Sequence, residues 1–199
     1  MSDSAQIQVQ GKGRITKDVI VTTAVLLFNR HGYDRTSMND IAVALGITKA
    51  ALYHHFVGKE EILIDGINRA SDIIDRKLQE RGNPAEASSD RVRNFIHAYG
   101  RALRDPMFCC FVLTDERVLG ADGRQILHNC KRRNQRQLER LLEDAGVSAD
   151  RVRGTALAIF GALNWCARAF GDHMDAEIAS VMGVLSPLYA PENADRVKP

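Results

Sequence analysis

Apolar residues recur every three or four positions along most of this chain, the spacing that places them on one face of an α-helix. Clusters of glycine, proline and serine separate segments over residues 15–30, 59–81, 88–104, 107–113, 149–170 and a last one that ends near 189. Another long helix is expected between the break at residues 120–123 and Asp144. Apart from Asp122-Gly123, the sequence lacks the turn pairs that join alternating strands. We therefore expect an all-α protein.

Residues 36–56 predict two short helices joined by a tight turn. Ser37 is a good N-cap, and Asp40 stands at the capping-box spacing in place of the usual Glu or Gln. The apolar face of the first helix consists of Met38, Ile41, Ala42 and Leu45. Gly46 follows where a helix often ends in a left-handed residue, and Thr48 caps the next helix. This is the layout of a helix-turn-helix, whose second helix enters the major groove of DNA.

Positive charge is concentrated in the same part of the chain. Residues 1–59 contain seven lysines and arginines against four acidic residues, whereas the net charge of the whole chain is only +2. A basic unit on a nearly neutral chain suits contacts with phosphates. The N-terminus does not resemble a signal peptide, and no apolar run approaches the ~18 residues of a membrane span. We therefore expect a cytoplasmic protein.

The helix-turn-helix segment and its flanks resemble the TetR family of bacterial transcriptional regulators. The matching elements are Ala24, Leu27-Phe28, Gly32-Tyr33, Thr36-Ser37-Met38, Asp40-Ile41-Ala42, Gly46-Ile47-Thr48, Leu52-Tyr53-His54-His55-Phe56 and Lys59-Glu60. The glycine and threonine that the family has after the capping pair are replaced by Ala50 and Ala51. The resemblance implies a helical homodimer that binds a double-stranded DNA operator and responds to a small-molecule effector.

The domain organisation follows from the motif and from the resemblance. We expect flexible tails over residues 1–13 and 191–199, at the two ends of the chain. Residues 14–58 are expected to form a three-helix DNA-binding domain with the helix-turn-helix. Residues 59–190 are expected to form a larger helical domain for ligand binding and dimerisation.

The outward positions of the capped helices, together with the matching family positions, predict the DNA contacts. We expect phosphate contacts from Thr36, Ser37, Thr48, Tyr53, His54 and Lys59. We expect Lys49 and Ala50 to lie against base edges.

The segment over residues 149–170 is apolar on two stripes, so it should be buried on most sides. In a dimer, one stripe would face the partner and the other the interior of the subunit. The final helix would complete a four-helix interface, as the resemblance also implies. The predicted interface residues are Val152, Leu163, Ile178, Val181 and Leu185.

Large side chains in the C-terminal part predict a pocket for an apolar or amphipathic effector, with an acyl-CoA as one possibility. The predicted lining residues are Phe95, Tyr99, Met107, Phe108, Phe111, Asn164, Trp165 and Arg168. The same side chains also suit an ordinary core. The basic run from Lys131 to Arg140 fits either an anionic ligand or a solvated helix face.

Other chemistries have weaker signals in this sequence. The four cysteines lack metal-ligand spacing and are expected to be structural thiols. No catalytic triad, glycine-rich phosphate loop or metal-ligand pair stands out, so we expect no enzyme activity, no metal and no cofactor. We expect a repressor that the effector releases from DNA. The alternative is a DNA-binding module with a solid C-terminal domain and no effector.

Overall fold

A computed structural model describes residues 15–79, 87–170 and 174–189, and every regular element among them is helical. The first three helices are α1 (Lys17–His31), α2 (Met38–Leu45) and α3 (Lys49–Tyr53). The remaining α-helices are α4 (Lys59–Gln79), α5 (Ser88–Ala102), α6 (Pro106–Leu113), α7 (Ala121–Asp144), α8 (Ala149–Phe170) and α9 (Met174–Leu185). Short 3₁₀ turns cover Glu116–Val118 and Ser186–Leu188. The all-α prediction is confirmed.

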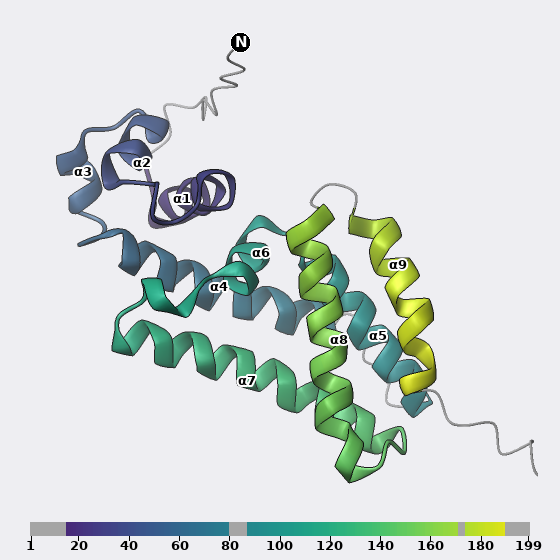
Figure 1. Ribbon diagram of the computed structural model, residues 1–199. Helices are drawn as coiled ribbons and strands as arrows, with labels where there is room; N and C mark the ends of the chain where they lie inside the picture. Colours follow the sequence, from purple (N-terminus) through teal and green to yellow (C-terminus); the bar gives the residue numbers. More distant parts are fainter. Residues whose placement is uncertain (1–14, 80–86, 171–173, 190–199) are drawn as a thin grey trace, which may run out of the picture.

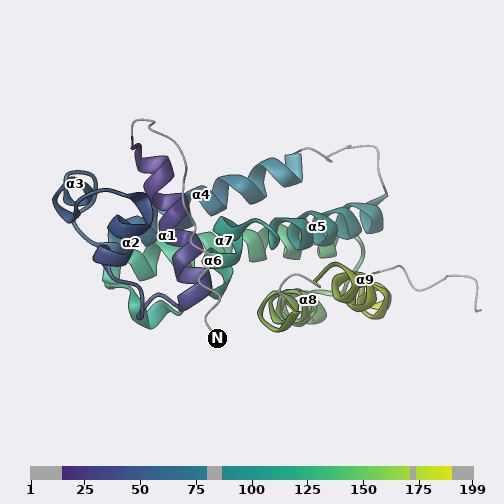
Figure 2. The ribbon, with the colours of Figure 1, turned by 90° about the horizontal axis from the view of Figure 1, so that it is seen from above.

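The helices form a small unit and a larger one, with α4 running from the first into the second (Figure 1). Helices α1, α2 and α3 gather at one end, and α4 packs against α1 before it reaches α5, α6 and α7. In the view from above, α8 and α9 lie side by side at the edge of the larger unit (Figure 2). In the part of the chain described here, no helix is long and apolar enough to cross a membrane.

Helix α7 begins earlier than the glycine break at residues 120–123 predicts. Gly120 is its N-cap, and Gly123 lies buried in its first turn. A Cβ atom at Gly123 would approach Glu60 Oε1 to 3.1 Å and Ile64 Cδ1 to 3.2 Å. The glycine therefore permits close packing of α7 on α4 and does not stop the helix.

The last α-helix ends before the expected position near Tyr189. It ends at Leu185, and Pro187 lies in the 3₁₀ turn that follows, where it has no N–H to continue the α-helical pattern. Some predicted features lie outside the described residues. They are the tails over residues 1–13 and 191–199, the helix stop at residues 82–84 and the cap at residues 171–172.

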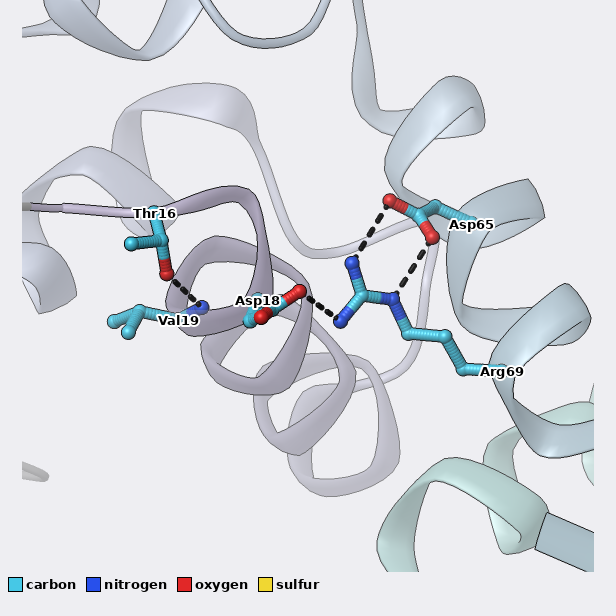
Figure 3. Close-up of polar contacts among 5 residues, drawn as sticks. All are labelled: Thr16, Asp18, Val19, Asp65 and Arg69. Carbon is cyan, nitrogen blue, oxygen red and sulfur yellow. Dashed lines mark hydrogen bonds and ion pairs between the residues drawn. The ribbon is translucent and has the colours of Figure 1, made fainter. Parts of the chain in front are cut away.

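Two polar contacts fix the small unit on the larger one. Arg69 of α4 binds both oxygens of Asp65 and reaches Asp18 of α1, with an Nη1–Oδ1 distance of 2.6 Å (Figure 3). The side-chain amide of Asn29 on α1 donates to the carbonyl of Pro106 on α6, at 2.8 Å. Helix α1 is therefore bonded to both α4 and α6.

Candidate nucleic-acid interface

The turn between α2 and α3 has the geometry that its sequence predicts. Ser37 Oγ accepts from the Asp40 N–H at 3.2 Å, and the Asp40 carboxylate accepts from the Ser37 N–H at 2.8 Å. Both bonds of the capping box are therefore present, and the Ser37 bonds lower the pKa of Asp40. Gly46 is left-handed, with φ 67°, and its N–H caps α2. This closed turn fixes the angle between α2 and α3.

Helix α3 is short and points its polar residues outward. Thr48 caps it by accepting from the Ala51 N–H at 3.1 Å, and Leu52 anchors it with a fully buried side chain. Lys49, Ala50, Tyr53 and His54 are exposed on the other side, and the Lys49 ammonium group lies 5.8 Å from the centre of the Tyr53 ring. These exposed residues, together with Ser37 and Thr48, form one face, which we call the α3 face.

Thr36 does not belong to the α3 face, although the sequence places it among the phosphate contacts. Its side chain is 2% exposed, and its hydroxyl donates to the Gly32 carbonyl at 2.9 Å. Its own N–H donates to the Tyr33 carbonyl. Because both donors are used inside the protein, Thr36 closes the loop between α1 and α2.

Lys59 also differs from its expected role. Its ammonium group donates to the carbonyls of Tyr33 at 2.9 Å, Thr36 at 3.2 Å and Asp34 at 3.5 Å. It also lies 4.2 Å from the centre of the Tyr33 ring. All three N–H donors of a lysine are thereby used. Lys59 therefore holds the loop after α1 against the start of α4, and its direct contact with a phosphate is removed from the predicted set.

Three exposed residues near the α3 face were missed in the sequence analysis. Arg35 precedes the capping box and is held by a 2.6 Å bond from its Nε to the His31 carbonyl. Val43 on α2 and Val57 after α3 are 71% and 84% exposed. The sequence could have indicated that two of them are exposed. Val43 falls on the polar side of the α2 pattern, and Val57 follows the aromatic cluster.

Comparisons with known proteins agree with this geometry. Residues 20–65, which include the whole helix-turn-helix, match the family model described as bacterial regulatory proteins, tetR family. The DNA-binding unit of this chain is therefore similar to that of the TetR family. A curated relative is the negative transcriptional regulator of the biofilm operon icaADBC, IcaR, from Staphylococcus aureus. It is 32% identical over 83 residues, which are 42% of this chain and 45% of IcaR, so the match spans less than half of that relative.

Solved structures of TetR regulators extend the likeness over both units of the chain. The regulator PfmR from Thermus thermophilus superposes with a TM-score of 0.73 and 28% identity, covering 90% of this chain and 99% of that one. The protein AibR, in complex with isovaleryl coenzyme A and operator DNA, gives a TM-score of 0.76 and 25% identity. That match covers 88% of this chain and 99% of AibR. The chain therefore shares the fold of these proteins well beyond its DNA-binding unit.

The residues predicted to line an effector pocket do not lie together in the structure. Tyr99, Phe111 and Asn164 line a cavity of about 170 Å³ between α5, α6, α7 and α8, which we call the α7–α8 cavity. Phe95 and Phe108 are buried behind it in an aromatic cluster. The other three lie elsewhere: Met107 packs near Gly66 of α4, and Trp165 and Arg168 are exposed.

The prediction that Asn164, Trp165 and Arg168 share one site is therefore wrong. Consecutive residues on an α-helix point about 100° apart, so Asn164 and Trp165 face different directions. Trp165 is 64% exposed on the outer side of α8. Arg168 lies one turn after Asn164 and lines a separate hollow of about 320 Å³ with residues of α1, α4 and α6.

The predicted dimer residues are mostly inside the subunit. Val152, Leu163, Ile178 and Leu185 are no more than 8% exposed, and Val181 is half-buried. They pack α8 and α9 on the rest of the domain. For example, Ile178 lies so close to α5 that a Cβ atom at Gly100 would meet it at 3.1 Å. Both stripes of α8 are apolar, so periodicity alone does not tell which of them is buried within the subunit.

A different apolar face is exposed on α8 and α9. We call it the α8–α9 face, and its residues are Gly154, Ala158, Gly161, Trp165, Ala179, Gly183 and Val184. Among the described residues, and apart from its own helix backbone and chain neighbours, a Cβ atom at Gly154, Gly161 or Gly183 would meet no atom within 4 Å. The face is therefore open and can be approached closely.

The cysteines are free thiols that lie apart from the α3 face. Burial raises the pKa of Cys110 to about 12, so its reactive thiolate form is scarce at neutral pH. Among the described residues, no group of His, Cys, Asp and Glu has the arrangement of a metal site.

Proposed function

We propose that this chain is a transcriptional repressor that binds a pseudo-palindromic operator as a homodimer and is released by a small molecule. The observation that carries the proposal is the α3 face, a set of exposed polar residues held rigidly by two capped helices. Residues 14–58 are assigned to DNA binding and residues 59–190 to ligand binding and dimerisation. Such a regulator acts in the cytoplasm on the bacterial chromosome.

The proposed DNA contacts divide into two kinds. Lys49 and Ala50, in the first turn of α3, lie against base edges in the major groove. Ser37, Thr48, Tyr53 and His54 contact phosphates, and the exposed Arg35 joins them. Lys59 and Thr36 act indirectly, since they hold the loop that precedes the capping box.

The proposed dimer uses the α8–α9 face. One helix-turn-helix contacts too few base pairs for tight specific binding, so a second recognition helix is needed. The small residues Gly154, Ala158 and Gly161 allow a partner helix to approach closely, and Trp165 supplies a large apolar contact. A two-fold arrangement of this face brings two α3 faces to one side of the operator.

The proposed effector site is the α7–α8 cavity. Its presence supports a ligand-responsive regulator over a DNA-binding module with a solid C-terminal domain. IcaR is described as a negative regulator, and AibR was crystallised with both a small molecule and operator DNA. The first description supports repression, and the second supports a small molecule and operator DNA as the two ligands of this chain.

Selection of bound duplexes from a random DNA library tests the DNA-binding part of the proposal. We expect a pseudo-palindrome whose half-sites lie one helical turn, about 34–36 Å, or a multiple of it apart. Lys49→Ala should weaken binding to the selected sequence and relax preference at the contacted base pair by about 1–3 kcal/mol. The control is Arg132→Ala, which removes one exposed positive charge from α7 and should leave the selected sequence unchanged. Recovery of random sequences only would contradict the proposal.

A further inference from the structure

We infer that the α7–α8 cavity takes a compact organic acid, with one ring or a short branched chain, one carboxylate and one hydrogen-bond donor such as a hydroxyl. The inference rests on the proposed function, because it names the chemical class of the effector. Four features of the cavity carry it: an unpaired buried oxygen, an oriented amide, aromatic walls of limited volume and a cation at the rim.

Asn134 of α7 provides the unpaired oxygen. Its side chain lines the cavity and is 3% exposed, and its Oδ1 atom has no hydrogen-bond partner within the described part of the chain. A buried acceptor without a donor is costly, and native proteins rarely leave one unpaired. A hydroxyl or N–H group of a ligand in the cavity supplies the missing donor.

Asn164 of α8 provides an oriented donor. The Tyr99 hydroxyl donates to Asn164 Oδ1 at 3.0 Å, which leaves the amide nitrogen of Asn164 as the group that can donate. Burial raises the pKa of Tyr99, so its hydroxyl stays protonated and keeps this bond at neutral pH. The cavity thus contains an acceptor on one helix and a donor on another, and a ligand with both kinds of group fits this pair.

The walls limit the size of the ligand and favour a ring. Tyr99 and Phe160 meet edge-to-face with centroids 4.9 Å apart, and Phe111 and Val112 of α6 line the same space. The volume is about 170 Å³, and an apolar cavity of about 150 Å³ is enough to hold benzene. A single ring therefore fills the space, whereas the nucleotide part of a coenzyme A ester has to remain outside it.

Lys131 provides the positive charge. It lines the cavity one turn before Asn134 and is exposed, so it sits at the rim. The nearby carboxylates of Asp115 and Glu116 are bonded to Arg117 and His128, respectively. Both carboxylates still attract Lys131 through space, and partial burial lowers the pKa of its ammonium group, so the carboxylate of a ligand whose ring lies deeper in the cavity supplies a close anionic partner.

Titration calorimetry on the full-length protein with a matched set of small molecules tests this inference. The probes are benzoate, 3-hydroxybenzoate, 4-hydroxybenzoate, the uncharged 4-hydroxybenzyl alcohol and isovaleryl-CoA. Operator release by each probe is measured in parallel by fluorescence anisotropy of labelled DNA. We expect at least one hydroxybenzoate to bind about tenfold more tightly than benzoate, because only the hydroxyl pairs Asn134.

Two substitutions locate the binding groups, and a third serves as the control. Asn134→Leu should remove the preference for the hydroxyl while benzoate still binds, and Lys131→Gln should weaken the acids by about tenfold and not the alcohol. Arg132→Gln removes the same charge from the adjacent, outward position of α7 and should change neither the preference for the hydroxyl nor the binding of the acids. Urea unfolding of each variant checks that the fold is kept. Because Lys131 is exposed, Lys131→Gln tests the binding site without changing the packing of the core.

The outcomes separate this inference from the proposed function. If none of the three acids binds below about 10 mM, the inference of a compact acid is overturned and the cavity holds water alone. The inference is also overturned if the preferences for the hydroxyl and for the carboxylate survive Asn134→Leu and Lys131→Gln. Binding of isovaleryl-CoA alone would also overturn it while supporting an effector of another class. Acids that bind without changing operator affinity would confirm the site and contradict its role in release. Loss of specific DNA binding in the unmodified protein would contradict the proposed function instead.

Discussion

The DNA-binding unit and the C-terminal domain place their polar groups differently. Around the helix-turn-helix, side chains bond to backbone a few residues away, as Thr36 does to Gly32 and Thr48 to Ala51. In the C-terminal domain, Tyr99 bonds to Asn164, which lies 65 residues later, and Asn134 Oδ1 has no partner among the residues that the structure describes. Local bonds fix the turn and the N-caps on which the α3 face is built. The long-range bond and the cavity belong to the site where we propose that a ligand binds.

The largest effect is expected from Gly161→Trp on the α8–α9 face. The change adds a large side chain to an open surface, so the subunit keeps its own fold while a close partner is excluded. We expect monomers by light scattering and a loss of operator affinity of about 100-fold or more, since only one half-site remains bound. Gly161→Ala is the matched control and should stay dimeric. A Gly161→Trp protein that remains a dimer would mean that the subunits meet elsewhere.

The second effect separates a structural lysine from a DNA-contacting one. Lys59→Met removes three bonds to carbonyls and should lower the free energy of unfolding by about 2 kcal/mol, with little change in the salt dependence of DNA binding. Lys49→Met should leave stability within about 0.5 kcal/mol, because Lys49 is exposed. Urea unfolding and salt titrations of DNA binding distinguish the two. A loss of about 0.9 in the salt slope for Lys59→Met alone would restore Lys59 as a phosphate contact.

The third effect probes the junction between the two regions. Glu60, in the first turn of α4, accepts from the Gly120 N–H at 2.6 Å and so caps α7, whose N-cap residue has no side chain to do this. Glu60→Ala should destabilise the protein by about 1 kcal/mol, whereas Glu60→Gln keeps an acceptor and should retain most of the stability. Equal stabilities of Glu60→Ala and the unmodified protein would show that α7 does not need this cap.

The smallest effect concerns the capping box and depends on pH. Bonds from Ser37 lower the pKa of Asp40 in the folded protein, so their contribution is complete above the unfolded pKa of about 4. It is lost as the pH falls through the lower folded value, because the carboxylate becomes protonated. Asp40→Ala should therefore reduce stability at pH 7 by about 0.5–1 kcal/mol, and the difference should shrink in acid. A difference that stays constant down to about pH 2 would exclude the carboxylate as its source.

The helix-turn-helix could be predicted from the sequence because its determinants are local. The N-cap Ser37, the left-handed Gly46 and the cap Thr48 each act within four residues, so their spacing specifies the turn. The same spacing did not reveal that Lys59 bonds to carbonyls more than twenty residues earlier. That contact depends on how the loop after α1 returns to α4, which no local pattern encodes.

In the C-terminal domain, periodicity predicted the helices and not their partners. Helix α8 has two apolar stripes, and only packing decides that Leu163 is buried while Trp165 is exposed. The cavity depends on Asn134, a polar residue in the middle of a basic segment that gave no sign of burial. Residues from four helices meet there, so the site follows from tertiary packing alone.

Hydroxyl-radical footprinting of the protein on a selected operator tests whether a dimer binds DNA through two α3 faces. We expect two protected patches related by the pseudo-two-fold symmetry of the DNA, centred about 34–36 Å or a multiple of that distance apart. Both patches should disappear together in Gly161→Trp at concentrations that saturate the unmodified protein. A single protected patch, or two patches that Gly161→Trp leaves intact, would contradict a dimer that reads DNA through its two α3 faces.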